Sequence, residues 1–136
     1  MNSELSLTLY KKLYLIRRAE ELIVQHYPED EMKTPMHMSM GQEAAAVAVC
    51  HALGDSGQVF GFYRSHALFL AKTGDSDGFF GELYGKVLGP AHGKGGSMHL
   101  IDQEVGFMGS TAIVGGTIPI GVGLGLSIQL KNTDQV

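Results

Sequence analysis

Glycine recurs throughout residues 85–116, which predicts a long loop in that part of the chain. Its densest string, Gly-Lys-Gly-Gly-Ser-Met-His, occupies residues 93–99, and a second string, Ile-Val-Gly-Gly-Thr-Ile-Pro, occupies residues 113–119. Glycines leave backbone N–H groups uncovered, so an anion can approach them, and Lys94 adds a positive charge. Loops of this length inside a compact domain are usually functional. We interpret the loop as a site for a phosphorylated ligand.

The run from Val105 to Leu130 contains no charged residue and is long enough to cross a membrane. Gly121 and Gly125 also have the spacing of packed membrane helices. Against a membrane span, the run contains seven glycines and Pro119, and no aromatic belt or basic flank marks its ends. We therefore expect a helix buried in a protein core or a subunit interface, with a membrane segment as the alternative.

Composition narrows the class of protein. A chain of 136 residues that is 44% hydrophobic and 18% charged is typical of one globular domain. A net charge of −4 without a basic stripe argues against a nucleic-acid partner. The single cysteine, Cys50, excludes a disulfide within the chain and is expected to be a buried small hydrophobe in a reducing compartment. Residues 1–5 have no basic region typical of a signal or transit peptide, so we expect a cytoplasmic location without a membrane anchor.

Apolar periodicity predicts the first helices. Leu5, Leu9, Leu13, Ile16 and Ile23 recur at helical spacing and predict a helix over residues 4–27, which Ser3 can cap and Pro28 ends. Residues 28–38 are expected to form a loop. Residues 39–42 then match a capping box, because a serine hydroxyl is followed three residues later by an amide. The helix predicted over residues 43–53 carries mostly alanine and valine, which suggests close packing on all its sides.

Further along, residues 58–62 predict one buried strand. Helices are expected over residues 65–72, 77–84 and 117–131, with a long loop over residues 85–116. The alternation of helices with a strand indicates an α/β layer fold. One strand cannot build a parallel sheet, so the chain is expected to be incomplete, and Val136 is placed where another strand would begin.

Several residues are candidates for a functional site. Tyr63 and Arg64 directly follow the predicted strand, where ligands bind in open α/β sheets, and both suit a phosphate. The alternative for Arg64 is a structural ion pair with Asp55. His37, His66 and His99 each lie in a loop or at the end of an element, so each is suited either to acid–base chemistry or to a structural role. No histidine set has zinc-ligand spacing, and neither glycine string is a P-loop or a dinucleotide fingerprint.

Four motifs, at residues 41–44, 63–67, 93–100 and 113–119, together and in this order resemble one family. It is the α subunit of the thiamine-diphosphate-dependent first component of 2-oxo acid dehydrogenase complexes, and the resemblance covers about residues 9 to 136. It implies an oxidoreductase that decarboxylates pyruvate or a branched-chain 2-oxo acid, or acts on acetoin, and transfers the acyl group to a lipoyl arm. The cofactor would carry the chemistry while the protein positions it.

The resemblance also assigns roles to residues. Tyr63 and Arg64 match the pair that contacts the cofactor's diphosphate. His37 matches a histidine that faces the reaction centre, and His66 and His99 match histidines that line the same cleft, so all three are catalytic candidates. The apolar wall at the aminopyrimidine ring corresponds to Ala112, Ile113 and Val114.

For the fold, the resemblance implies an incomplete thiamine-diphosphate-binding fold, a parallel sheet flanked by helices that is mostly helical in the part present. Residues 1–136 would be the N-terminal part of that domain, with the helix in residues 1–27 packing on it. The implied partners are a β subunit and a second α subunit, in an α2β2 heterotetramer, together with the lipoyl-bearing acyltransferase component and a 2-oxo acid substrate.

The chain departs from the family in its metal-binding motif. Family members bind magnesium through a Gly-Asp-Gly motif, whereas Asp55 and Asp75 both lie in Gly-Asp-Ser strings. We therefore expect no metal ligands in this chain, although the cofactor is magnesium–thiamine diphosphate, and we expect the isolated chain to be inactive. The alternative function is a truncated, cofactor-free interaction or regulatory module of the same fold, which the retained Tyr63, Arg64, His37 and His99 speak against.

Overall fold

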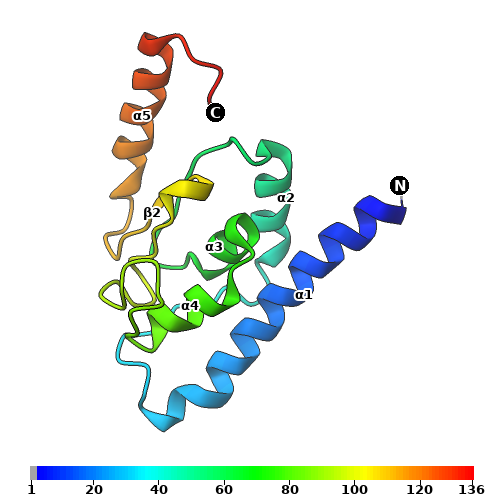
Figure 1. Ribbon diagram of the computed structural model, residues 1–136, viewed down its shortest axis with the longest axis vertical. Helices are drawn as coiled ribbons and strands as arrows, with labels where there is room; N and C mark the ends of the chain where they lie inside the picture. Colours follow the sequence, from blue (N-terminus) through cyan, green and yellow to red (C-terminus); the bar gives the residue numbers. More distant parts are fainter. Residues whose placement is uncertain (1–2) are drawn as a thin grey trace.

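The computed structural model describes residues 3–136, so Met1 and Asn2, part of the N-terminal segment that shows no signal-peptide pattern, lie outside the described residues. Most of the described chain is helical, with five α-helices and a very small sheet, and Figure 1 shows their arrangement. The elements, in chain order, are α1 (Ser3–His26), η1 (Tyr27–Glu29), α2 (Glu43–Leu53), β1 (Val59–Phe60), α3 (His66–Thr73), α4 (Ser76–Leu83), η2 (Gln103–Val105), β2 (Phe107–Gly109) and α5 (Thr117–Lys131). The predicted helices are thus confirmed to within a few residues, and the predicted loop over residues 85–116 is interrupted only by η2 and β2.

The sheet is parallel and has two strands. The backbone N–H of Val59 donates to the carbonyl of Gly106 at 2.9 Å, and that of Gly61 donates to the carbonyl of Gly109 at 2.8 Å. The expectation of a single strand was wrong, because β2 is only three residues long and lies among glycines, where no alternating pattern can be recognised. The chain crosses from β1 to β2 through α3, α4 and the glycine-rich loop, as a parallel pair requires.

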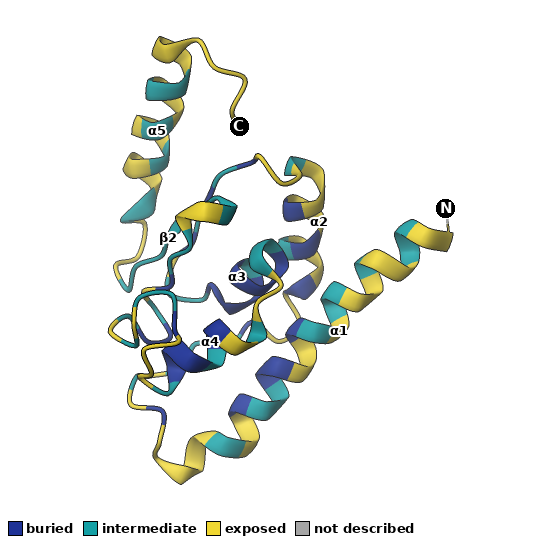
Figure 2. Ribbon diagram, viewed as in Figure 1, coloured by how far each residue is buried: buried dark blue, intermediate teal, exposed yellow. Residues whose placement is uncertain are grey.

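The core lies between the sheet and the helices. Phe69 of α3 stacks on Phe79 of α4 at 6.1 Å between ring centroids, and it meets Phe107 of β2 edge-on at 5.3 Å. Figure 2 shows the buried face of α1 turned toward the other helices, and Ile16 and Ile23 carry that face. Helix α1 packs against α2 and α3, which places the long N-terminal helix along one side of the molecule.

Two expectations about α2 were wrong. Gln42 precedes the helix without any side-chain capping bond, and the hydroxyl of Ser39 instead accepts a hydrogen bond from the backbone N–H of Ala67 at 3.4 Å. A tertiary partner on α3 has therefore replaced the local capping box. The helix is also not packed on all sides, because Ala48 and Val49 are exposed while Val47 is buried.

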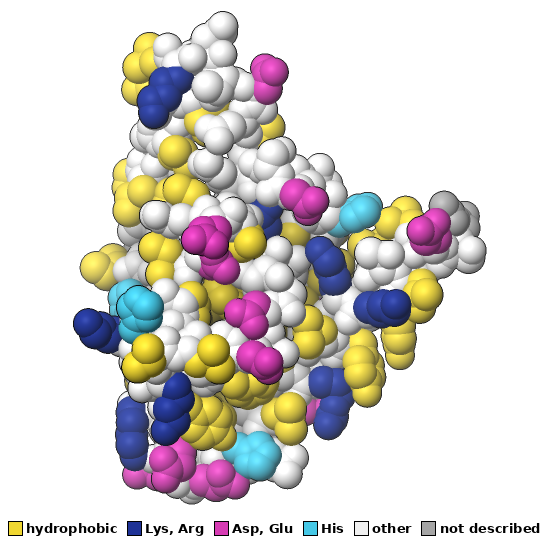
Figure 3. Space-filling view, in the orientation of Figure 1, with side chains coloured by type: hydrophobic (Ala, Val, Ile, Leu, Met, Phe, Trp, Pro, Cys, Tyr) yellow, Lys and Arg dark blue, Asp and Glu magenta, His cyan; other side chains and the backbone are white. Residues whose placement is uncertain are grey.

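Helix α5 lies apart from the core at one end of the molecule (Figure 1). It has no buried residue, and large apolar side chains, among them Ile118, Val122 and Leu126, are exposed on it, as the hydrophobic surface in Figure 3 shows. The described residues do not cover this helix, so its expected burial in a protein core or a subunit interface stays a prediction. Within residues 3–136, no helix is long and apolar enough to span a membrane.

Cys50 occupies the buried face of α2, as predicted for a small hydrophobe. Burial raises the pKa of its thiol above the ordinary value. The thiol is therefore kept protonated and unreactive at neutral pH.

An ion pair ties α1 to α2. Arg17 Nε donates to Glu43 Oε1 at 2.7 Å, with the carboxylate buried and the guanidinium half exposed. The hydrogen bond from Arg17 lowers the pKa of Glu43 below its ordinary value of 4.5, and the same bond raises the pKa of Arg17. Because the pKa of Glu43 is lower in the folded state, the pair stabilises the fold above pH 4.5 and loses this effect as the pH falls through the lowered value.

We predict that Glu43→Gln flattens the acid limb of the stability profile. The free energy of unfolding in urea would fall between about pH 6 and about pH 3.5 in the unaltered protein and would fall less in the variant. Glu21→Gln is the matched control, since Glu21 forms an exposed pair with Arg18 within α1. An equal decline in Glu43→Gln and the unaltered protein would show that the pair contributes nothing to acid sensitivity.

Candidate functional site

The structure brings three of the predicted site residues into one cluster. The rings of His37 and Tyr63 meet edge-on at 4.9 Å between centroids, and the guanidinium carbon of Arg64 lies 5.6 Å from the Tyr63 ring centroid. Arg64 Nε and His37 Nδ1 are both buried and have no hydrogen-bond partner among the described residues. Buried polar atoms are nearly always satisfied in proteins, so two orphans in side chains that contact the same ring point to a missing polar ligand.

The alternative for Arg64 was an ion pair with Asp55. Among residues 3–136 that pair does not form, and Lys72 Nζ instead donates to the backbone carbonyls of Gly54 and Asp55 at 2.8 and 3.1 Å. Arg64 thus keeps a donor for another group.

A cavity of about 230 Å³ adjoins Arg64 between α2 and the segment that follows β1. Its walls are mostly apolar, with Ala45, Val49 and Phe62 among the lining residues. Apolar walls beside one cationic donor suit a ligand with an anionic group and an apolar body.

The carboxyl ends of both strands meet at one edge of the sheet. Tyr63 and Arg64 follow β1, and residues 110–114 follow β2 at the same edge, which is where ligands bind in open α/β sheets. Ala112 is half-buried there, whereas Ile113 and Val114 are 70% and 79% exposed. The predicted apolar wall therefore stands at the expected edge with its two large side chains uncovered.

His99 is held near this edge by a serine. Ser110 Oγ accepts a hydrogen bond from the Leu100 N–H at 2.8 Å and lies 3.0 Å from the Met98 carbonyl, to which it can donate. The two contacts flank His99, whose own side chain is exposed. The backbone of His99 is thus fixed next to the end of β2, while its imidazole is free to meet a ligand.

His66 lies in a different environment from the other two histidines. Its Nδ1 is 3.0 Å from Glu20 Oε1 and its Nε2 is 2.6 Å from Ser97 Oγ. With the carboxylate as acceptor, Nδ1 carries the proton and Nε2 accepts from the serine hydroxyl. The order is that of a Ser-His-Glu nucleophilic triad. All three side chains are 0% exposed, so no substrate reaches the serine, and the contacts tie α1, α3 and the glycine-rich loop together.

The glycine-rich loop surrounds a carboxylate of the chain itself. Glu82 is fully buried; its Oε2 accepts the N–H groups of Ala91 and Gly93 at 2.9 and 3.1 Å, and its Oε1 accepts those of Gly95 and Gly96 at 2.6 and 3.1 Å. The expectation that these N–H groups cradle a phosphorylated ligand was therefore wrong. These N–H groups already donate to the carboxylate of Glu82.

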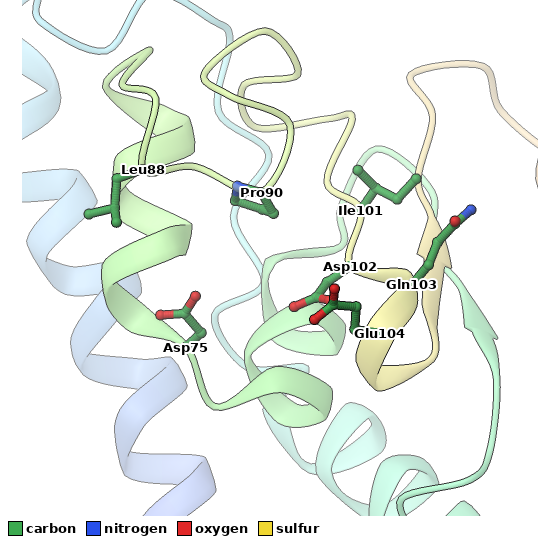
Figure 4. Close-up of a pocket in the computed structure, with 7 residues that line it drawn as sticks. All are labelled: Asp75, Leu88, Pro90, Ile101, Asp102, Gln103 and Glu104. Atoms are coloured by element: carbon green, nitrogen blue, oxygen red, sulfur yellow. The ribbon is translucent and has the colours of Figure 1, made fainter.

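A larger cavity of about 430 Å³ lies elsewhere, between the start of α4 and η2. Figure 4 shows that Asp75, Asp102 and Glu104 border it. Asp75 already caps α4 by accepting the N–H of Gly78. Within residues 3–136, no group of three or more His, Cys, Asp or Glu side chains could hold a metal ion.

Sequence reasoning missed Glu20, Glu82 and Ser110. The available signal for Glu20 was its position on the apolar stripe of α1, four residues after the buried Ile16. Glu82 is the one charged residue in the otherwise apolar string Phe-Phe-Gly-Glu-Leu, which lies near the end of a predicted helix. An acid among buried positions indicates a partner inside the fold, because an unpaired buried charge is costly.

Comparison with known proteins identifies the family of the chain. The sequence profile of the dehydrogenase E1 component family matches residues 11–136. The chain belongs to this family. The resemblance found in the four sequence motifs is thereby confirmed.

Among its relatives, the α subunit of acetoin:2,6-dichlorophenolindophenol oxidoreductase from Bacillus subtilis is 35% identical over the whole chain, which covers 41% of that protein. The α subunit of the mitochondrial pyruvate dehydrogenase E1 component from Saccharomyces cerevisiae is 36% identical over 94% of the chain and 30% of that protein. The corresponding subunit from Rhizobium meliloti is 36% identical over 99% of the chain and 39% of that protein. The chain thus spans less than half the length of these relatives and corresponds to their N-terminal part.

We predict that Ser97→Ala destabilises the fold by about 1–3 kcal/mol, because it leaves His66 Nε2 buried without a partner. The free energy of unfolding, measured in urea at neutral pH, checks this. Ser56→Ala, at an exposed position, is the control and should change stability by less than about 0.5 kcal/mol. Equal effects of the two substitutions would contradict the buried network.

Proposed function

We propose that this chain forms part of the α subunit of a thiamine-diphosphate-dependent E1 dehydrogenase and supplies one side of its cofactor site. The observation that carries the proposal is the pair of buried orphan atoms, Arg64 Nε and His37 Nδ1, in two side chains that both contact the Tyr63 ring. Family membership and the names of the relatives support it. The reaction would be oxidative decarboxylation of a 2-oxo acid, or the corresponding cleavage of acetoin, with acyl transfer to a lipoyl group.

The residues present fit the cofactor in chemical type. Arg64 offers a guanidinium donor and Tyr63 a phenol for the diphosphate, and the apolar residues Ala112, Ile113 and Val114 would cover the aminopyrimidine ring. When bound, thiamine diphosphate would supply the nucleophilic carbon and the electron sink of the reaction. The magnesium ion that accompanies the diphosphate would need ligands from outside the described residues.

The histidines would have different tasks. His37 Nδ1, buried and without a partner, and the exposed ring of His99 are candidates to hold or move a proton next to the substrate. A catalytic role for His66 stays a prediction, and its burial between Glu20 and Ser97 favours a positioning role instead.

The proposal includes partners. The exposed apolar residues of α5, such as Ile118 and Val122, would be covered in an α2β2 heterotetramer by a β subunit or a second α subunit. The lipoyl-bearing acyltransferase would receive the acyl group, and a cytoplasmic location fits the composition. The competing function, a cofactor-free interaction module, would use the same exposed helix but would not need the orphan atoms at His37 and Arg64.

We predict that this chain can replace the corresponding N-terminal part of the Bacillus subtilis relative. The chimera, expressed with that enzyme's other subunit, would reduce 2,6-dichlorophenolindophenol in the presence of acetoin and thiamine diphosphate. In it, Arg64→Lys would raise the apparent KM for thiamine diphosphate about tenfold or more with a smaller change in kcat, because lysine cannot reproduce planar guanidinium contacts. Tyr63→Phe would raise it less.

Arg18→Lys is the matched control, since Arg18 is exposed on α1 and pairs with Glu21 of the same helix. An active chimera in which Arg64→Lys leaves the KM for the cofactor unchanged would rule out the diphosphate role. A folded chimera without any cofactor-dependent activity would favour the interaction module.

We also predict that the isolated chain does not bind magnesium–thiamine diphosphate in the micromolar range. Arg64 and Tyr63 provide only part of the contacts that a diphosphate needs, and the described residues hold no carboxylate set for the metal. Isothermal titration calorimetry of the chain alone checks this. Micromolar affinity would contradict the view that the chain supplies one side of a shared site.

A further inference from the structure

The glycine-rich loop is organised around Glu82, a residue for which neither the family motifs nor the proposed function has a use. Its carboxylate is fully buried and receives four backbone N–H groups from residues 91, 93, 95 and 96. A carboxylate has about four acceptor positions, so these bonds use its whole capacity. Helix α4 therefore carries an internal anion around which the loop folds.

The loop cannot form these bonds with ordinary side chains in place of its glycines. Gly93 and Gly96 have φ values of +75° and +60°, and a Cβ at Gly96 would lie 2.4 Å from a Thr34 side-chain carbon. A Cβ at Gly95 would lie 2.2 Å from the His99 carbonyl oxygen. The glycines thus allow the backbone to close on the carboxylate and on the segment that carries His99.

The loop leads directly from the Glu82 carboxylate to two functional candidates. Gly95 and Gly96 bind Glu82, the next residue, Ser97, binds His66, and His99 follows two residues later. Ser110 contacts the backbone of the residues before and after His99, Met98 and Leu100. The backbone around His99 is therefore anchored to the buried Glu82 and His66 on one side and to the half-buried Ser110 on the other.

We propose that Glu82 is a positioning residue, which acts as the resident anion of the glycine-rich loop and sets the place of His99 at the carboxyl edge of the sheet. The part that concerns His99 in catalysis rests on the proposed function. The claim that Glu82 organises the loop is independent of the proposed function, so the experiments that test it need no cofactor.

The first experiment is a chemical rescue. Glu82→Ala removes the Cγ methylene and the carboxylate, which together have the size of acetate, and it leaves four N–H donors around the vacated space. Amide hydrogen exchange of residues 91, 93, 95 and 96 would become roughly 10- to 100-fold faster in the variant. Sodium acetate would restore slow exchange, and sodium chloride at the same ionic strength would not.

Leu83→Ala is the matched control. It truncates the neighbouring buried side chain of the same helix without touching an N–H donor of the loop. Acetate would leave its exchange pattern and stability unchanged. Equal responses of both variants to acetate, or no difference between acetate and chloride in Glu82→Ala, would overturn the proposal.

The position of His99 provides a readout that loss of stability alone does not move. In two-dimensional NMR spectra, Glu82→Ala would shift the backbone and ring signals of His99, and acetate would return them toward the unaltered positions. Leu83→Ala would leave those signals in place. His99 signals that are unchanged in a folded Glu82→Ala variant would overturn the positioning role.

If Glu82→Ala does not fold alone, its refolding in acetate becomes the readout. Two further variants, Glu82→Asp and Glu82→Gln, are then compared by the protection of the four amides. Aspartate keeps the anion and would retain more protection at the four amides than glutamine, whose NH2 group opposes N–H donors. Failure of acetate to refold the alanine variant, together with equal protection in the other two, would overturn the proposal. Cofactor titration of the chimera described above tests the proposed function separately.

Discussion

Four backbone N–H groups converge on the Glu82 carboxylate, and much of the structure depends on how that buried charge is satisfied. An unpaired carboxylate in the interior would be very unfavourable, so α4 can be buried against the core only when the loop closes over it. The loop in turn reaches its closed form only because glycines allow the necessary backbone conformations. The burial of α4 and the closure of the loop therefore depend on each other.

A second buried carboxylate extends this arrangement across the molecule. Glu20 on α1 binds His66 on α3, and His66 binds Ser97 at the end of the same loop. The aromatic contacts of Phe69 with Phe79 and Phe107 join the helices to β2 without any polar group. Polar contacts fix the direction of the loop, and apolar contacts supply the bulk of the core. The cluster of His37, Tyr63 and Arg64 adjoins this network, because Arg64 precedes His66 by two residues.

The sequence predicted what depends on local patterns. The stripe through Ile16 and Ile23 located α1, and the position of Arg64 after an apolar run placed it at the end of a strand. Partners distant in the chain could not be predicted from spacing, as Ser39 shows by binding Ala67 instead of capping α2. Strand β2 was missed for a related reason, since its pairing with β1 and not its composition makes it a strand.

The glycine-rich string shows how a correct family signal can carry a wrong physical interpretation. Uncovered N–H groups and Lys94 predicted an external anion, and the family resemblance placed a diphosphate nearby. In the structure, Glu82 accepts the N–H groups of Ala91, Gly93, Gly95 and Gly96, while Arg64 Nε is among the buried polar atoms without a partner in the described residues. A glycine-rich loop can therefore close on an internal acid, and the residues proposed to hold the ligand are then found elsewhere, at Tyr63 and Arg64.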